Sequence, residues 1–220
     1  IPAIEVLDSP SSICLGDTTS ATVTAGLESY LWAPQDGILS QDSNQVSFSP
    51  SDNQRYILTV TNGFGCQNLD TLFIRVWKLP KADAGDDKEM CAEDSVTLFA
   101  TGGVLYDWNN GGILSNPSSN TGSTKAYPLA TTDFEVVVTD SNGCQSSDIA
   151  QVVVFQLPEV NAGEDIENCD VDVVYLGGSL VIDPTLSYRW DPADGLSDPF
   201  SPNPYVIEPQ NTVYTLEVQD

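Results

Sequence analysis

Alternation of large apolar and polar side chains predicts short strands at several places along this chain. The clearest stretches are residues 56–60, 134–139 and 213–218, where every second residue is a large apolar one. Residues 72–76 and 149–154 follow the first two and predict a closing strand in each region. No stretch of comparable length has the i, i+3, i+4, i+7 apolar stripe of an amphipathic helix. The pattern therefore predicts an all-β protein.

One order of signals occurs three times. The Leu-Pro pair at 79–80 recurs at 157–158, and the Gly-Cys pair that ends at Cys66 recurs at Cys144, so the period is about 78 residues. That length is typical of a small domain rather than of a solenoid turn. Each copy also contains a Tyr-x-Trp triplet, whose indoles are Trp32, Trp108 and Trp190.

A β-rich unit of this length, with a Trp in a middle strand, is typical of an immunoglobulin-like sandwich. We therefore expect three tandem antiparallel β-sandwich domains, at residues 1–80, 81–158 and 159–220. The third is expected to be truncated at its C-terminal end, because its closing strand has no counterpart in the sequence.

The five cysteines fit this division as intradomain disulfides. Cys14 and Cys66 are 52 positions apart and Cys91 and Cys144 are 53 apart, so we predict the bridges Cys14–Cys66 and Cys91–Cys144. The same offset places a partner for Cys169 just beyond the last residue, which predicts that truncation leaves Cys169 unpaired. Such pairing indicates an oxidising compartment. The alternative is a set of buried free thiols in a cytosolic protein.

Charge and composition exclude several functions. The chain has 32 acidic and 7 basic residues and a formal net charge of −25, so we expect no nucleic acid partner. The lack of histidine removes Ser-His and Cys-His catalysis and imidazole metal sites. No apolar run reaches the roughly 18 residues of a membrane span, so we expect no direct membrane insertion. Three near-equal modules are also a poor scaffold for one active site, and we expect no catalytic residues.

Acidic clusters after the two expected boundaries are candidate calcium ligands. They comprise Asp83, Asp86 and Asp87 at the first boundary, and Glu164 and Asp165 at the second. Ca²⁺ takes six to eight oxygen ligands, and short Asp-rich loops can supply several of them. Calcium is the one cofactor that the sequence suggests. The alternative is a solvated acidic linker, because neither loop matches an EF-hand.

The repeated tryptophans have two interpretations. Their recurrence at one place in every copy predicts that Trp32, Trp108 and Trp190 are structural core, buried against the disulfide of each domain. The alternative is a row of exposed aromatic platforms that stack on sugar rings. Trp77 has only Phe155 as a counterpart, and we expect it near the joint between the first two domains.

Several phrases are similar to a known class of repeats. They are Ala-Asp-Ala-Gly-Asp-Asp at 82–87, Val-Asn-Ala-Gly-Glu-Asp at 160–165, Asp-Ser-Asn-Gly-Cys at 140–144 and the ending at 212–220. Together they resemble the tandem PKD/Ig-like repeats of giant surface proteins of gliding Bacteroidetes, the SprB-like class, over essentially the whole chain. The first copy departs from this pattern, since Asp-Ser-Pro-Ser-Ser at 8–12 replaces the Ala-Gly-Asp phrase.

The resemblance implies a non-enzymatic repeat segment of a large adhesin filament that serves surface attachment and gliding motility. It also implies export by type IX secretion and a place at the cell surface, associated with the outer membrane. Its partners would be neighbouring repeats of the same chain and a surface polysaccharide or other adhesion substrate. The alternative is an accessory Ig-like module array of a secreted polysaccharide-degrading enzyme, which uses the same kind of module.

Overall fold

The computed structural model describes residues 4, 6–8, 11–109, 113–167, 173–177, 183–206 and 211–220. Its contacts group into two compact units, Ile1–Phe155 and Gln156–Asp220. Within the described part of the first unit, no sheet combines a strand that ends by Trp77 with one that begins after it. We call these two sets of strands module 1 (residues 6–77) and module 2 (residues 83–155), and the second unit module 3.

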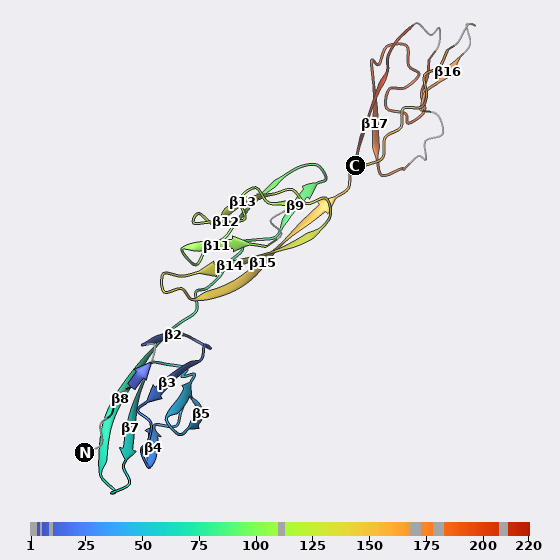
Figure 1. Cartoon of the computed structure of the whole chain (residues 1–220). Coiled ribbons are helices and arrows are strands. Elements are labelled where there is room, and N and C mark those ends of the chain that lie inside the picture. Colours follow the sequence, from blue (N-terminus) through green and yellow to red (C-terminus); the bar gives the residue numbers. More distant parts are fainter. Residues whose placement is uncertain are drawn as a thin grey trace. The chain divides into compact units, whose positions relative to one another are not determined.

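Module 1 consists of two sheets with the strand orders β1-β3-β6-β5 and β2-β8-β7-β4 (Figure 1). The pairing of β2 with β8 is parallel, and the other pairings in these sheets are antiparallel. Its strands are β1 (Val6–Asp8), β2 (Ser12–Cys14), β3 (Thr19–Val23), β4 (Ser29–Ala33), β5 (Ile38–Asp42), β6 (Gln45–Phe48), β7 (Gln54–Thr61) and β8 (Gln67–Trp77).

Strand β7 shows why the alternating pattern becomes a sandwich. Tyr56, Leu58 and Val60 are fully buried, whereas Ile57 between them is exposed. Successive side chains of a strand point to opposite faces, so every second residue enters the space between the two sheets. The core of module 1 therefore collects one face of each sheet.

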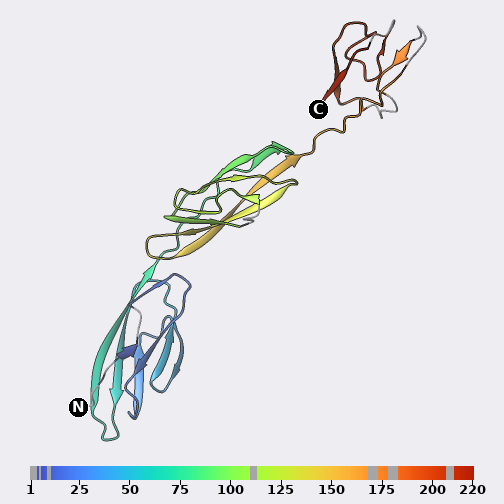
Figure 2. The same cartoon turned by 45° about the horizontal axis from the view of Figure 1, so that its top comes forward.

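Module 2 repeats this plan with its own core. Its strands are β9 (Lys88–Cys91), β10 (Val96–Phe99), β11 (Leu105–Trp108), β12 (Ser118–Ser119), β13 (Ser123–Ala126), β14 (Thr132–Thr139) and β15 (Gln145–Phe155). The sheets have the orders β12-β11-β14-β15-β9 and β10-β13. Trp108 faces Val136 across the β11–β14 pair, as Trp32 faces Leu58 across β4–β7. Figure 2 shows the two sets of strands from a second angle.

Module 3 carries the same central hairpin. Its strands are β16 (Val174–Tyr175), β17 (Ser187–Asp191), β18 (Tyr205–Val206) and β19 (Thr215–Gln219), paired as β16-β18 and β17-β19. Tyr188, Trp190 and Leu216 form its buried cluster. Trp190 faces Leu216 in the register that Trp108 and Val136 have in module 2.

The predicted fold class is confirmed: the chain is all-β and is built from tandem immunoglobulin-like sandwiches. Predicted strands at 56–60, 72–76, 134–139 and 149–154 lie inside β7, β8, β14 and β15. The boundaries at residues 80 and 158 and the truncation of the third domain remain predictions. Within the part that the structure describes, no helix is long and apolar enough to cross a membrane.

Candidate functional site

The disulfide of this chain joins two modules, so the predicted pairing within each domain is wrong. Cys14 of module 1 is bonded to Cys144 of module 2, with their Cα atoms 5.6 Å apart and a sequence separation of 130. Cys66 and Cys91 are exposed free thiols. Cys169 lies outside the described residues, so its predicted unpaired state is untested.

Strand length explains the error. Cys14 lies beside Trp77, the last residue of β8, whereas Cys66 comes directly before Gln67, the first residue of that strand. A strand of 11 residues at about 3.3 Å per residue separates its ends by roughly 36 Å. A disulfide needs Cα atoms within about 7 Å, so two cysteines of one module cannot meet.

Module 2 has the same separation. Cys91 lies beside Phe155 at the end of β15, and Cys144 precedes Gln145 at its start. The β15 strand also has 11 residues, so its ends are as far apart as those of β8. Modules 1 and 2 therefore each have one cysteine near each end of the long closing strand. This placement favours disulfides between modules over disulfides within one.

The Cys14 half of the bond is held at the edge of a sheet. The amide of Leu15 donates to the carbonyl of Trp77 at 2.8 Å, which continues the parallel β2–β8 ladder past Cys14. Asp17 closes the following turn: its amide donates to the Cys14 carbonyl at 3.0 Å, and its Oδ2 accepts from the Cys14 amide at 3.3 Å. The position of Cys14 is thus fixed by backbone pairing.

The Cys144 half lies in a tight loop that Asp140 organises. Asp140 Oδ1 accepts hydrogen bonds from the amides of Asn142 at 2.8 Å and Cys144 at 2.9 Å. Burial raises the pKa of the Asp140 carboxyl, but the hydrogen bonds from Cys144, Asn142 and Gly143 outweigh it and hold the pKa below its ordinary value. Cys144 is only 1% exposed. The ionised carboxylate therefore holds this cysteine in place.

Trp77 lies at the joint, where we expected it. It is half-buried, and the guanidinium carbon of Arg75 lies 5.0 Å from its ring centroid, in a cation–π arrangement. Trp77 and Cys14 line a small cleft together with Asn142 from the Cys144 loop. The end of module 1 and this loop of module 2 are therefore neighbours in space.

The structure places the three repeated tryptophans in the cores. Trp32, Trp108 and Trp190 are 1%, 2% and 2% exposed, so none offers a face for a sugar to stack on. They do not pack on an intradomain disulfide as predicted, because the bond lies at the joint. Trp32 instead makes an edge contact with Phe48, at a centroid distance of 5.4 Å.

Hydrogen bonds from the indoles add to this packing. The Trp108 Nε1 donates to the carbonyl of Gly122 at 3.2 Å, and Trp190 Nε1 donates to that of Ser201 at 3.1 Å. A buried Trp N–H needs such a partner, because leaving it unpaired would cost a desolvation penalty.

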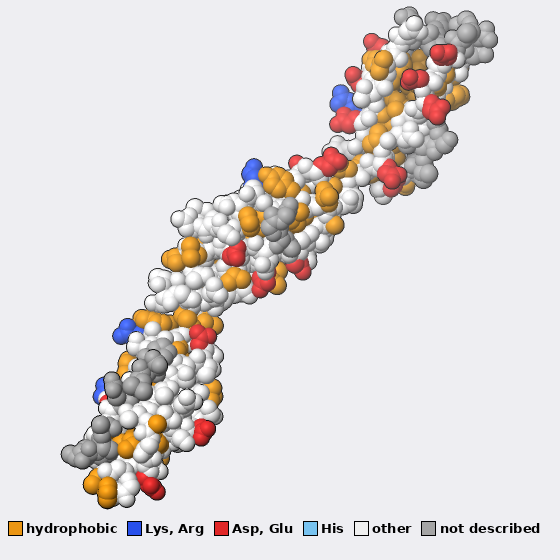
Figure 3. Space-filling model, in the orientation of Figure 1, with side chains coloured by type: hydrophobic (Ala, Val, Ile, Leu, Met, Phe, Trp, Pro, Cys, Tyr) orange, Lys and Arg blue, Asp and Glu red, His pale blue; other side chains and the backbone are white. Residues whose placement is uncertain are grey.

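Two of the acidic residues at the first boundary accept hydrogen bonds from backbone amides. Asp83 Oδ1 accepts from the Gly85 amide at 2.9 Å, and Asp87 Oδ1 accepts from the Gln151 amide at 2.9 Å, while Asp86 is exposed. Figure 3 shows acidic side chains scattered over the visible face, with few basic ones. In the described ranges, no three acidic or cysteine side chains gather closely enough to hold a metal ion.

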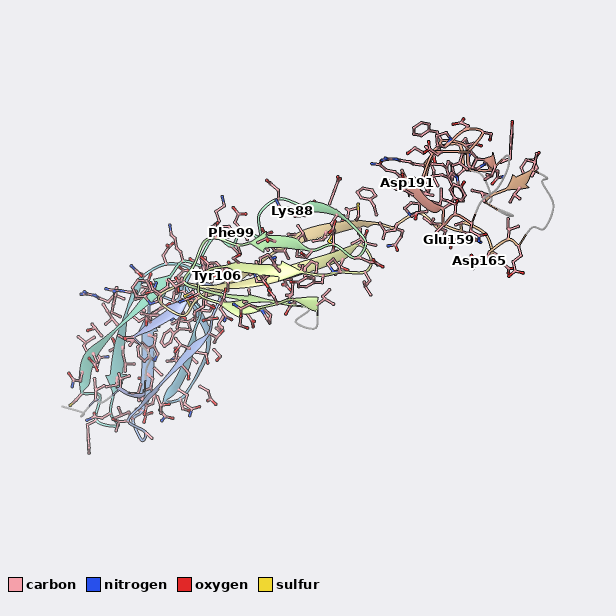
Figure 4. The ribbon with its side chains drawn as sticks, turned by 90° about the horizontal axis from the view of Figure 1, so that it is seen from above. Lys88, Phe99, Tyr106, Glu159, Asp165 and Asp191 are labelled. Atoms are coloured by element: carbon pink, nitrogen blue, oxygen red, sulfur yellow. A yellow bond between two sulfur atoms is a disulfide. The ribbon has the colours of Figure 1, made fainter. Side chains whose placement is uncertain are left out.

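At the second boundary, Glu164 and Asp165 are exposed. Figure 4 places Asp165 and Glu159 on the segment that leads to β16, and Asp191 at the end of β17. Calcium binding stays a prediction. A thermal melt in millimolar Ca²⁺, compared with Mg²⁺ at equal ionic strength and with chelator, tests it, because plain charge screening responds equally to both ions.

Comparison with known proteins finds a distant relative. No family model matches the chain. It is 29% identical over 229 residues to the dyslexia-associated protein KIAA0319 homolog of Rattus norvegicus, an alignment that covers 89% of this chain and 21% of the relative. The chain thus spans about a fifth of the length of that protein.

Similar solved structures share little sequence with the chain. One is the N-terminal eight Ig domains of the Down syndrome cell adhesion molecule, with 13% identity, a TM-score of 0.41 and coverage of 99% of this chain and 40% of that one. Another is a C-terminal intimin fragment in complex with the intimin-binding domain of its translocated receptor, with 12% identity, a TM-score of 0.39 and coverage of 67% and 62%. These likenesses concern the fold alone.

Proposed function

We propose that this chain is a non-enzymatic spacer segment of a cell-surface adhesion protein, in which sandwich modules are set end to end. The observation that carries the proposal is the Cys14–Cys144 bond, because it ties module 1 to the loop between β14 and β15 of module 2. An internal bond would stabilise a single domain, whereas a bond across a joint fixes the order and contact of neighbours. Holding consecutive modules together is what an extended spacer requires.

The chemistry of the modules agrees with an extracellular position. Disulfides persist in oxidising compartments and are rare in the cytosol, so the bond favours a secreted or surface protein. The net charge of −25 repels other anionic surfaces. Neighbouring modules of the same chain are the partners that the bond directly supports.

A more specific assignment rests on the sequence phrases at 82–87, 140–144 and 160–165. On these we propose a segment of a SprB-like gliding-motility adhesin filament, exported by type IX secretion to the outer membrane. A surface polysaccharide or another adhesion substrate would then be bound elsewhere in the filament, since the three repeated indoles, Trp32, Trp108 and Trp190, are buried.

Replacement in the surface protein that carries this segment tests the spacer role. Deleting residues 1–220 should reduce attachment of the cells, because the binding end would reach less far. Inserting an unrelated three-domain sandwich array of equal length should restore attachment, since a spacer contributes length and stiffness alone. Deletion without effect, or failure of the replacement to restore attachment while the protein still reaches the surface, would contradict the proposal.

A further inference from the structure

Two cysteines outside the bond, Cys66 and Cys91, have the same local structure as the two that form it. The loop at Cys66 has the same hydrogen bonds to the cysteine backbone as the loop at Cys144. Asn62 Oδ1 accepts from the Cys66 amide at 3.0 Å, as Asp140 Oδ1 accepts from the Cys144 amide at 2.9 Å. The Asn62 amide donates to the Cys66 carbonyl at 3.0 Å, and the Asp140 amide donates to that of Cys144 at 2.9 Å.

The strand end at Cys91 likewise matches the one at Cys14. Cys91 pairs with Phe155 in the parallel β9–β15 ladder, as Cys14 pairs with Trp77 in β2–β8. The next amide, that of Ala92, donates to the Phe155 carbonyl at 2.7 Å, in the way that the Leu15 amide donates to Trp77 at 2.8 Å. Cys91 therefore has the same place beside the end of β15 in module 2 as Cys14 has beside the end of β8 in module 1.

We propose that Cys66 and Cys91 each form a disulfide to a further module, of the same kind as the bond between Cys14 and Cys144. Cys91 receives a cysteine from an Asp140–Cys144 type of loop on the adjoining module of the same chain. Cys66 is the loop half and receives a strand-end cysteine from a module of this class. Both thiols are exposed, whereas the bonded Cys144 is 1% exposed. The occupant of each site is thus another sandwich module.

Bond formation follows ordinary thiol–disulfide exchange. The Cys91 thiol and the thiol of the incoming cysteine each lose a proton, and a new Sγ–Sγ bond forms. The two protons and two electrons released reduce one molecule of an external disulfide, such as oxidised glutathione, to two thiols. Two features select the partner: the distance of about 36 Å that separates Cys91 from Cys144 in its own module, and the end-to-end contact seen at Cys14.

The register of module 3 allows a direct test. Tyr188 faces Val218 across β17–β19 as Tyr106 faces Val138 across β11–β14, so Asp220 occupies the position of Asp140. Adding a copy of residues 141–155 after Asp220 then supplies module 3 with the cysteine loop and the closing strand. The proposal is independent of adhesion, and this experiment fails or succeeds whatever the spacer does on a cell.

The extended chain is equilibrated in a glutathione redox buffer, blocked with N-ethylmaleimide and digested with trypsin without reduction. Cleavage after Lys88, Lys125 and Arg189 places Cys91, Cys144 and the added cysteine in three different peptides. We expect the peptide 89–125 linked to the C-terminal peptide, together with the native link between the peptides that hold Cys14 and Cys144. The control is the same extension with serine in place of the added cysteine, in which Cys91 should carry maleimide.

Three results would overturn the proposal in a chain that keeps the Cys14–Cys144 link. In the first, the added cysteine bonds to Cys169. In the second, the added cysteine and Cys91 both remain free thiols. In the third, Cys91 forms a disulfide only between two copies of the chain. Cys66 should carry maleimide in both chains, because neither offers it a free strand-end cysteine from a preceding module. A disulfide between Cys66 and the added cysteine would also count against the equivalence on which the proposal rests.

Discussion

Modules 1 and 2 share one strand plan but fill their cores by different means. In module 1, Phe48 lies between Trp32 and Tyr56, with ring centroids 5.4 Å and 4.5 Å away. In module 2 the position of Phe48 is taken by Ala126: Phe48 pairs with the first residue of β3, and Ala126 pairs with the first residue of β10. The fold is therefore set by the apolar alternation and the turns. The identity of a core side chain can differ between the modules, provided that the core remains filled.

Gly122 supplies a backbone partner for the indole of module 2. Gly122 has a positive φ of 71°, and its carbonyl accepts from the indole of Trp108 and from the amide of Ala100. A Cβ at Gly122 would overlap the carbonyl oxygen of Ala100. Module 1 has Asn44 at this position, whose side-chain amide donates to the Val23 carbonyl at 2.9 Å. Both modules keep the backbone bond at this position, since the Val23 amide donates to the Asn44 carbonyl at 2.8 Å, but the close approach of Ala100 leaves room only for a glycine in module 2.

The largest expected effect is that of removing an indole. Trp108→Ala should lower the free energy of unfolding of its module by about 3 to 5 kcal/mol, the usual range for a buried aromatic changed to alanine. It also leaves the Gly122 carbonyl with one donor fewer. Urea denaturation followed by near-UV circular dichroism measures this, with Trp32→Ala as the matched change in module 1. A variant that unfolds at the wild-type urea concentration would show that Trp108 is not part of the core.

A glycine substitution tests the close packing itself. Gly122→Ala should cost about 2 to 4 kcal/mol, because it adds a backbone overlap to the roughly 1 to 2 kcal/mol of a left-handed conformation. Gly143→Ala is the control: its φ is also positive, at 85°, but a Cβ there meets nothing within 4 Å. Chemical denaturation of both variants compares them. Equal losses of stability would mean that φ alone, and not space, requires the glycine.

Tyr56 gives module 1 a hydrogen bond that Phe134 cannot make at the same place in module 2. Its hydroxyl donates to the Asp36 carbonyl at 2.8 Å, so Tyr56→Phe should cost about 1 kcal/mol at neutral pH. Burial, and secondly the charge of Asp36, raise the pKa of Tyr56. Its contribution to stability is therefore present below pH of about 10 and lost as pH rises through the higher folded value.

Melting temperatures between pH 8 and pH 11 check this difference. The Tyr56→Phe chain should lose less stability over that range than the wild type. Identical slopes for the two chains would show that the Tyr56 hydroxyl is not in the environment described for it.

The smallest effect concerns the cap of each cysteine loop. Asp140 has a lowered pKa, so its contribution is complete above the ordinary value of about 3.9 and is lost as pH falls through the lower folded value. Asn62, the cap in module 1, does not titrate. Asp140→Asn should therefore flatten the loss of stability between pH 5 and pH 2, and Asn62→Asp should steepen it. Calorimetry of the two variants against the wild type measures both changes, and slopes shifted in the opposite directions would exclude the capping role.

Much of the fold could be predicted, because the strands and the buried indoles depend on local alternation and on repetition. The alternation at 56–60 and 134–139 marks which side chains enter the core whatever the neighbouring module does. The disulfide could not be predicted from spacing, since a repeat makes Cys14 equally well placed in sequence for Cys66 and for Cys144.

A signal for the correct pairing was nevertheless present. A closing strand follows Cys66 directly and runs to Trp77, next to Cys14, and its length keeps the two cysteines of a module apart. Converting residue counts into strand length would have excluded the bridge within the module. The acidic residues at the first boundary left no such signal. Nothing in the sequence distinguishes a metal ligand from the roles of Asp83 and Asp87 as acceptors of backbone hydrogen bonds.

The bond between Cys14 and Cys144 also determines the path that a pulling force takes through the polypeptide. Tension applied outside this pair crosses directly from one sulfur to the other, and the intervening chain carries none of it. At about 3.5 Å per residue, a separation of 130 residues corresponds to roughly 450 Å of contour length withheld from stretching. Modules 1 and 2 can therefore unfold and refold under load without lengthening the tether by that amount, until a reductant opens the bond.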